Sequence, residues 1–291
     1  MMKIGIVGTG MLGEAVGLNL LKRGHKVIVY NRTTKKTNKL KENGAIVVDT
    51  PCDVARDSEI VFTVVKDADA VEQVSFGNNG ISDCQIEGLV VADMSTINPL
   101  RTKKIAQKFS EKDIIMLDTP VMGGPNVAID GKLVLMASGD KEVFEKFRTV
   151  FETIGHKVFF LGEVGTAHSV KLAMNLQIAM LALALSEGIT LTRSAKVDPE
   201  IFLEILNSTY FKTGMSEKKA YKMIKDVFEP TFTLANLKKD LSTINETAKS
   251  FGMSLPMGSQ AEQVYCKALD NGFGDLDYTG ILAYLKKSVN S

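Results

Sequence analysis

The sequence has no tryptophan, and only three cysteines and three histidines among its 291 residues. Cys52, Cys84 and Cys266 are widely separated and form no C-x-x-C pair, so we expect neither a disulfide framework nor a zinc site. The histidines also lack the spacing of metal ligands. The sequence therefore predicts a protein without structural metal.

An excess of charge of one sign is lacking as well. Lysine and arginine total 35, aspartate and glutamate total 34, and the net charge is +1. This balance indicates neither a basic groove for nucleic acid nor a patch for a membrane surface. No signal peptide precedes the first expected strand, which begins at Lys3. We expect a cytoplasmic protein whose partner is a small molecule.

Apolar residues make up 45% of the sequence, and the length allows two domains. In the first part, short apolar segments alternate with helical ones. The expected strands are residues 3–8, 26–30, 45–48, 60–65, 89–94, 114–117, 132–137 and 157–161. This alternation indicates an α/β domain with a Rossmann-type, doubly wound parallel sheet, which we assign to residues 1–162.

The strand signals then stop, and residues 163–291 read as an all-α domain. It opens with an unbroken helix of roughly 28 residues, about 42 Å long. Between Leu172 and Leu185 only Asn175 and Gln177 are polar, so nearly every face is apolar. Such a helix is buried on all sides, and its apolar run is too short to cross a bilayer comfortably. We expect a buried central helix that joins the domains, partly covered by a second subunit of a homodimer or homotetramer.

The central helix carries a single lysine, Lys171, and Asn175 lies one turn further on the same face. Most helical lysines extend into solvent, and this is the alternative here. The neighbours Val170, Leu172 and Met174 are apolar, however, and a buried ammonium group releases its proton more easily. Lys171 is therefore a candidate general acid, with Asn175 to orient it or a substrate.

A glycine-rich turn, GTGMLG, follows the first strand. G-x-G-x-x-G alone is a weak signal, but between a strand and a helix it is typical of dinucleotide binding. The first glycine allows a tight turn, the second lets the backbone approach a pyrophosphate, and the third lets helix and strand pack closely. The helix N-terminus adds free N–H groups. A turn without ligand is the alternative. The predicted cofactor contacts are Gly8, Thr9, Gly10, Met11, Leu12 and Gly13.

The end of the second strand bears on the choice of cofactor. NAD-binding units usually carry an acidic residue there, which binds the ribose hydroxyls. This sequence has Asn31, Arg32 and Thr33 instead. An arginine can pair with a 2′-phosphate, so the sequence favours NADP over NAD, unless Arg32 is merely solvated.

Four blocks in this order resemble the β-hydroxyacid dehydrogenase family, which includes 3-hydroxyisobutyrate dehydrogenases and glyoxylate/succinic semialdehyde reductases. They are the turn at residues 8–13, DTPVMGG at 118–124, the segment 162–175, and FTLANLKKDL at 232–241. The resemblance extends over essentially the whole chain. It implies an NADP-dependent oxidoreductase that acts on a small β-hydroxy acid or semialdehyde.

The resemblance also implies residue roles. Lys171 matches the catalytic lysine of the family and Asn175 its partner. The implied substrate contacts are Thr96, Met122, Gly123, Gly124, Phe232 and Asp240. The further implied cofactor contacts are Val65, Lys66, Thr96 and Lys239, beside Asn31, Arg32 and Thr33.

Three positions depart from the family pattern. Met122 replaces a serine that helps to hold the substrate carboxylate, and Ala167 replaces a glycine before the catalytic helix. Lys66 stands where Pro or Ser is common; it either adds affinity for phosphate or is solvated. Two other functions stay open: an imine reductase, because such relatives share the architecture, and a cofactor-binding scaffold without catalysis.

Overall fold

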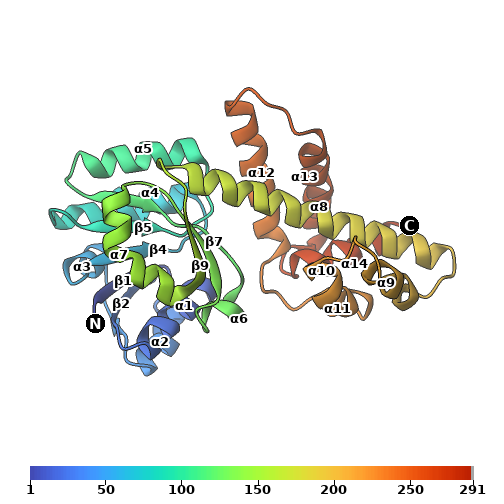
Figure 1. Ribbon diagram of the computed structural model, residues 1–291, viewed down its shortest axis with the longest axis horizontal. Coiled ribbons are helices and arrows are strands. Elements are labelled where there is room, and N and C mark those ends of the chain that lie inside the picture. Colours follow the sequence, from blue (N-terminus) through green and yellow to red (C-terminus); the bar gives the residue numbers. More distant parts are fainter. Residues whose placement is uncertain (290–291) are drawn as a thin grey trace. The chain divides into compact units, whose positions relative to one another are not determined.

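The computed structural model describes residues 1–289, and the chain divides into two compact units, Met1–Lys171 and Leu172–Ser291 (Figure 1). The first unit contains a six-stranded parallel sheet of order β3-β2-β1-β4-β5-β6. Its strands are β1 (Lys3–Val7), β2 (Lys26–Tyr30), β3 (Ile46–Val47), β4 (Ile60–Thr63), β5 (Val90–Asp93) and β6 (Ile115–Asp118). The predicted doubly wound Rossmann-type sheet is confirmed, and its strand order reverses between β1 and β4.

Helices cover both faces of this sheet. They are α1 (Met11–Lys22), η1 (Thr34–Thr37), α2 (Asn38–Glu42), α3 (Pro51–Arg56), α4 (Ala68–Phe76), η2 (Ile81–Cys84), α5 (Pro99–Ser110) and α7 (Lys141–Ile154). One apolar core joins α1, α2 and α7 to one face, and a second joins α3, α4, η2 and α5 to the other. Because both faces are covered, strands such as β4 are buried at every residue, which is why they read as continuous apolar runs.

A second, three-stranded sheet follows, of order β7-β8-β9, in which β7 and β8 are antiparallel. It comprises β7 (Val121–Met122), β8 (Leu133–Ala137) and β9 (Gly155–Phe160), with α6 (Pro125–Ala128) between β7 and β8. The sequence predicted β8 and β9 but not β7, α6, α4 or η2. Elements of two to four residues leave no periodic signal, and α4, with nine residues, is too short for a clear helical period.

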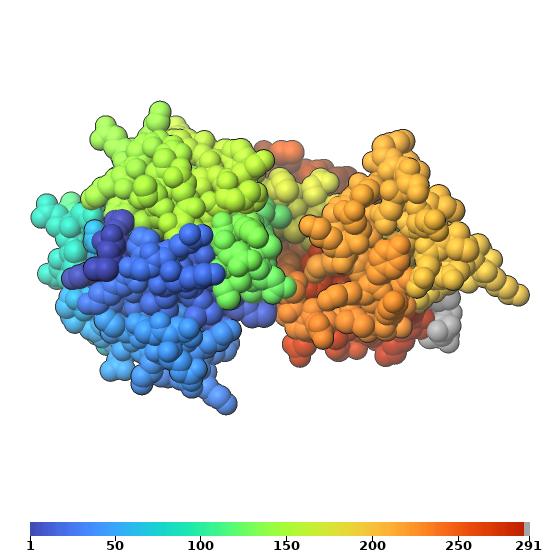
Figure 2. Space-filling view, turned by 60° about the horizontal axis from the view of Figure 1, so that its bottom comes forward, coloured from blue at the N-terminus to red at the C-terminus, as the bar shows by residue number. Residues whose placement is uncertain are grey.

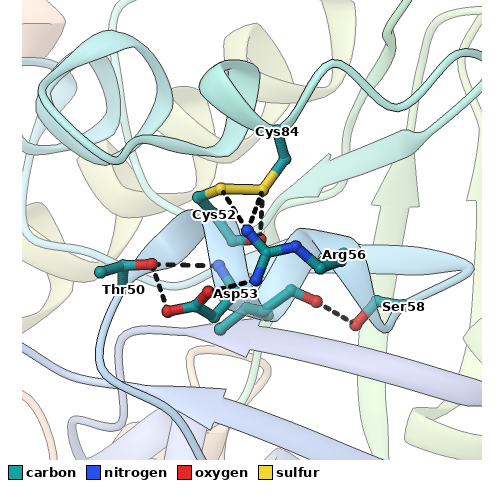
Figure 3. Close-up of a disulfide and its surroundings, with 7 residues drawn as sticks. Thr50, Cys52, Asp53, Arg56, Ser58 and Cys84 are labelled. Carbon is teal, nitrogen blue, oxygen red and sulfur yellow. Dashed lines mark hydrogen bonds and ion pairs between the residues drawn. A yellow bond between two sulfur atoms is a disulfide. The ribbon is translucent and has the colours of Figure 1, made fainter.

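The first unit also contains a disulfide, so the expectation that the cysteines form none is wrong. Cys52 in α3 is bonded to Cys84 at the end of η2, with 5.2 Å between the Cα atoms (Figure 3). The Arg56 guanidinium lies beside both sulfur atoms, with Nη2 3.5 Å from one and 3.7 Å from the other. The two cysteines meet because α3 and η2 share one core, which the 32-residue separation in sequence does not reveal.

The second unit is helical, as predicted. Its elements are α8 (Thr166–Ser194), which begins in the first unit, α9 (Pro199–Asn207), α10 (Gly214–Lys218), α11 (Ala220–Ile224), α12 (Leu234–Ser250), α13 (Pro256–Ala268), η3 (Leu269–Phe273), η4 (Tyr278–Gly280) and α14 (Ile281–Val289). One core packs α8 against α12 and α13, and a second packs its later part against α9 and α11. Figure 2 shows the segment α9–α11, in gold and orange, at the surface of this unit.

Within a single chain α8 is not buried on all sides, and the expected cover by a second subunit stays a prediction. Leu172, Ala179 and Ile189 are buried, but Met174 is 41% exposed and Leu191 71% exposed. The neighbouring helices of a small bundle cover one side of α8 and leave an apolar stripe exposed on the other. Among the described helices, α8 alone is long and apolar enough to meet the criteria for crossing a membrane, although its buried side chains pack as those of a core helix do.

Candidate active site

The parallel strands of the first unit end in register. Val7 pairs with Thr63, Thr63 with Asp93, and Asp93 with Asp118, so the last residues of β1, β4, β5 and β6 form one row across the sheet. The segments that follow these residues therefore start from one edge of the sheet. They include the glycine-rich turn, Val65 and Lys66, Thr96, and residues 119–124. This is the edge at which ligands bind in open α/β sheets.

The glycine-rich turn has the geometry that a pyrophosphate requires. Gly8 has φ +103°, which side-chain-bearing residues rarely adopt, and a Cβ at Gly13 would overlap the carbonyl oxygen of Gly8. Gly10, the N-cap of α1, has open space where its Cβ would be. An anionic group could therefore approach the backbone at Gly10 and meet the N-terminus of a twelve-residue helix. Met11 is half-exposed beside it.

Asn31 is turned into the protein rather than outward. Its Oδ1 accepts the Thr9 N–H at 3.0 Å, and its Nδ2 donates to the Thr33 carbonyl at 3.0 Å. Asn31 therefore fixes the glycine-rich turn to the segment after β2. Arg32 between these anchors is exposed and has no ion-pair partner among residues 1–289. Its side chain is open to solvent.

The segments after β4 and β5 are joined through Ser95. Its hydroxyl accepts the Val65 N–H at 3.1 Å, and its own N–H donates to Asp93 Oδ1 at 3.2 Å. Thr96 follows and is half-buried, whereas Lys66 is exposed. Two predicted cofactor contacts, Val65 and Thr96, are thus held by one short network.

Lys171 and Met122 lie 49 residues apart in sequence and are in contact. Lys171 Nζ is 3.3 Å from Met122 Sδ, and both residues are half-buried. The lysine is less enclosed than expected, because its neighbours Val170 and Met174 are each 41% exposed. Gly123 follows with φ +123°, and no hydrogen bond within the first unit uses its N–H. The loop after β6 therefore presents a thioether next to the ammonium group, and the backbone N–H of Gly123 follows it in the chain.

A buried polar network, which sequence reasoning missed, lies at the start of α8. The His168 ring is fully buried, with Nε2 2.7 Å from the Ser95 carbonyl oxygen and Nδ1 2.8 Å from Thr102 Oγ1. The Asp118 carboxylate accepts the N–H groups of Gly165 and His168 at 3.0 and 3.1 Å. One signal was present: His168 precedes Lys171 by three residues, about one helical turn.

In the second unit, three predicted residues form one chain of contacts. Asn175 is buried, and its Nδ2 donates to Asp240 Oδ2 at 2.6 Å. Asp240 Oδ1 lies 2.6 Å from Lys239 Nζ. Asn175 Oδ1 is buried without a hydrogen-bond partner among the described residues. The Phe232 ring is half-buried, 6.0 Å from that of Tyr278. The predicted residues are therefore grouped within each unit, and no group of metal-ligand type occurs among residues 1–289.

Comparisons with known proteins cover the same two parts of the chain. Residues 3–162 match the NAD binding domain of 6-phosphogluconate dehydrogenase, and residues 165–285 match the NAD-binding domain of NADP-dependent 3-hydroxyisobutyrate dehydrogenase. Glyoxylate/succinic semialdehyde reductase 1 of Arabidopsis thaliana is 32% identical over 99% of both chains. 2-Hydroxy-3-oxopropionate reductase of Escherichia coli is 31% identical over 99% of both. Among solved structures, a 3-hydroxyisobutyrate dehydrogenase of Salmonella typhimurium shares the fold, with TM-score 0.88, 23% identity, and 98% and 100% coverage.

Proposed function

Because the chain belongs to the β-hydroxyacid dehydrogenase family of oxidoreductases, we propose that it is an NADPH-dependent reductase of small aldehydes and semialdehydes, with Lys171 as the general acid. The observation that carries this proposal is the position of Lys171. Its half-buried ammonium contacts Met122 in the loop that leaves the ligand-binding edge of the sheet. It is the one lysine of α8, as the resemblance requires.

The chain's own residues fit a dinucleotide phosphate. The open face at Gly10 and the N–H groups of the first turn of α1 would bind the pyrophosphate, and Arg32 would bind the 2′-phosphate. Val65, Lys66 and Thr96 follow β4 and β5 at the same edge, and Lys239 is assigned to the cofactor in the second unit. When bound, the nicotinamide supplies the hydride.

The reaction adds a hydride and a proton to a carbonyl group. Lys171 donates its Nζ proton to the carbonyl oxygen as negative charge develops there, which for a general acid is worth about 10²–10⁴ in rate. Partial exposure then allows the neutral amine to regain a proton from water. The N–H groups of Gly123 and Gly124 bind a substrate carboxylate, while Thr96 and Met122 flank the substrate, as the resemblance implies.

Asn175 lies one turn further along α8, and we assign it to orienting Lys171 or the substrate. The buried Oδ1 without a hydrogen-bond partner among the described residues supports this assignment, because such an atom needs a donor. In the second unit, Phe232 and Asp240 are assigned to the substrate. We further propose a cytoplasmic homodimer or homotetramer, without nucleic-acid or membrane partners.

Replacing Lys171 tests the proposal. Lys171→Ala should lower kcat for NADPH-dependent reduction by roughly 10² or more, with an unchanged Kd for NADPH, because the lost proton donor acts mainly in the transition state. The assay follows NADPH loss with glyoxylate, succinic semialdehyde, an uncharged aldehyde and a cyclic imine. Lys157→Ala, an exposed lysine on β9, is the control.

Near-native kcat in folded Lys171→Ala would show that the lysine is not the acid. Turnover of the imine alone would assign an imine reductase instead. Binding of NADPH without turnover of any carbonyl compound would indicate a scaffold.

A further inference from the structure

We propose that His168 is a positioning residue, which fixes the segment that carries Thr96 against the helix that carries Lys171. This inference rests on the proposed function, since it gives Lys171 the role of the acid. His168 is fully buried, so we do not expect it to touch the substrate or the cofactor. It acts instead by fixing the backbone of neighbouring residues.

The contacts of His168 reach both segments. A carbonyl oxygen only accepts, so the Nε2 that lies 2.7 Å from the Ser95 oxygen carries a proton and donates it there. Nδ1 pairs with the hydroxyl of Thr102 on α5 at 2.8 Å. The ring is therefore fixed at both nitrogen atoms. It connects the first turn of α8 to the residue immediately before Thr96.

Ser95 is held at every polar atom it has. Its N–H donates to Asp93 Oδ1, its hydroxyl accepts the N–H of Val65, and its carbonyl accepts the proton of His168. Of these three contacts only the one with His168 comes from outside β5 and the segments that follow β4 and β5. It is therefore the contact that sets the position of Thr96 relative to α8.

The start of α8 is held equally firmly. Asp118, the last residue of β6, binds the N–H groups of Gly165 and His168, and Ser138 Oγ accepts the N–H of Ala167 at 3.1 Å. Lys171 lies one turn beyond these anchors. The same row of strand ends thus positions the general acid as well as the segment of Thr96.

A merely space-filling side chain could not replace this histidine. Asp93 Oδ2 is buried without a hydrogen bond among the described residues, and it lies 3.7 Å from His168 Nε2. Asp118 Oδ2 lies 3.6 Å from Nδ1. An apolar residue would leave the Ser95 carbonyl unpaired and remove the polar ring edge from between two buried carboxylates.

The test is a double-mutant cycle between His168 and Lys171. His168→Asn keeps an amide near the position of Nδ1 but loses the donor to Ser95, whereas His168→Gln can carry its amide to the position of Nε2. We expect His168→Asn to lower kcat by about 10–100-fold, since small displacements of reacting groups have effects of this size. KM and the Kd for NADPH should stay within about twofold, and His168→Gln should recover most of the loss.

In the Lys171→Ala background, His168→Asn should lower the remaining single-turnover rate by less than about threefold, because a residue that acts through Lys171 has nothing left to position. Ser169→Ala, on the same turn of α8, is the control; among the described residues its hydroxyl bonds only to the carbonyl of Gly165, the residue directly before α8. Thermal unfolding of every variant shows that it is folded.

If Lys171→Ala is impaired and the losses of the two single variants multiply in the double variant, the positioning role is overturned and the proposed function stays intact. An unimpaired Lys171→Ala would overturn the proposed function itself. If His168→Asn does not fold, Thr102→Val, which removes the partner of Nδ1, takes its place. Thr102→Val should lower kcat about 3–10-fold, and this loss should again become much smaller in the Lys171→Ala background. Losses that multiply in the double variant would overturn the positioning role.

Discussion

At the scale of single residues, the contact between Met122 and Lys171 bears on substrate choice. Met122 offers the ammonium a thioether, a weak acceptor, and offers a bound carboxylate no donor. Met122→Ser would add a donor, and a hydrogen bond to a charged group is worth about 1.5–3 kcal/mol. We expect the variant to shift kcat/KM toward glyoxylate, relative to succinic semialdehyde and an uncharged aldehyde, by about tenfold or more.

Met122→Leu is the matched control, because it retains a similar apolar volume without sulfur or hydroxyl. It should leave the ratios of kcat/KM among the three substrates near those of the wild type. If Met122→Ser leaves them unchanged as well, residue 122 does not face the substrate.

Arg32 is the residue on which cofactor choice depends. Its exposed guanidinium lies between the anchored Thr9–Asn31 contact and the start of η1. We expect Arg32→Ala to raise the apparent KM for NADPH by about tenfold or more while leaving that for NADH nearly unchanged, since a charge-assisted pair with phosphate is lost. Arg23→Ala, the control, also removes a positive charge, but at the C-terminal end of α1, away from the glycine-rich turn. It should change neither the KM for NADPH nor that for NADH. Equal losses with both cofactors in Arg32→Ala would disprove the assignment.

At the scale of elements, one ion pair holds η4 to the segment between α10 and α11. Lys219 Nζ lies 2.8 and 2.9 Å from the two oxygens of Asp277, whose side chain is 4% exposed. Burial by itself raises the pKa of Asp277, but the hydrogen bond and charge of Lys219, with the N–H of Thr231, outweigh it and hold this pKa below its usual value.

Removing the lysine should leave a buried carboxylate unpaired. We expect Lys219→Met to lower the free energy of unfolding by about 3 kcal/mol at pH 7, measured by urea denaturation. A depressed pKa means that the stabilisation is complete above the unfolded value of 3.8 and is lost as pH falls through the folded value. The difference between variant and wild type should therefore shrink below about pH 4.

Lys212→Met is the control, since the pair of Lys212 with Glu217 is exposed and screened by solvent. It should be much less destabilising at every pH. A deficit in Lys219→Met that is equal at pH 7 and pH 3 would show that lost packing, rather than the charge of Asp277, is responsible.

The long elements were predictable from the sequence, and the short ones were not. Helices α5, α7 and α12 each begin directly after an N-cap residue, Asn98, Asp140 and Thr233, which is a start signal visible in the sequence. In contrast, the helical segment after β2 begins as the 3-10 turn η1, and residues 214–224 are split into α10 and α11. A helical period over ten residues does not specify how each turn closes.

In the candidate site, the sequence predicts residues but not their contacts. Lys171 is predicted from its apolar helix and the family pattern, whereas its contact with Met122 depends on how β7 and α8 fold together. The His168 network joins residues 50 to 73 positions apart, and only the register of β5 and β6 brings Asp93 and Asp118 side by side. Tertiary pairing of this kind leaves no local periodicity to read.

At the scale of the whole molecule, the Cys52–Cys84 bond makes stability depend on the redox state of the surroundings. The bond closes an interval of 32 residues, for which chain entropy predicts a stabilisation of about 3–4 kcal/mol. Reduction should lower the Tm by about 5–10 °C. Thiol titration of the denatured protein should give one free group, Cys266, before reduction and three after it.

The variant Cys52→Ser/Cys84→Ser should have the Tm of the reduced protein and no response to reductant, while Cys266→Ser should respond as the wild type does. An unchanged Tm on full reduction would show that the packing of α3 on η2 suffices without the bond. The cytoplasm keeps most thiols reduced, so in the proposed compartment the reduced form would be the working one.

The boundary between the two units falls inside α8, after Lys171, and this position determines how susceptible the boundary is to proteolysis. Two-unit proteins are usually nicked in an extended linker. Here the peptide bond at the boundary follows a lysine, the residue after which trypsin cleaves, but it is helical and its next residue, Leu172, is 3% exposed. A protease needs several residues of extended chain in its active site. The bond between Lys171 and Leu172 therefore resists cleavage for as long as α8 remains helical.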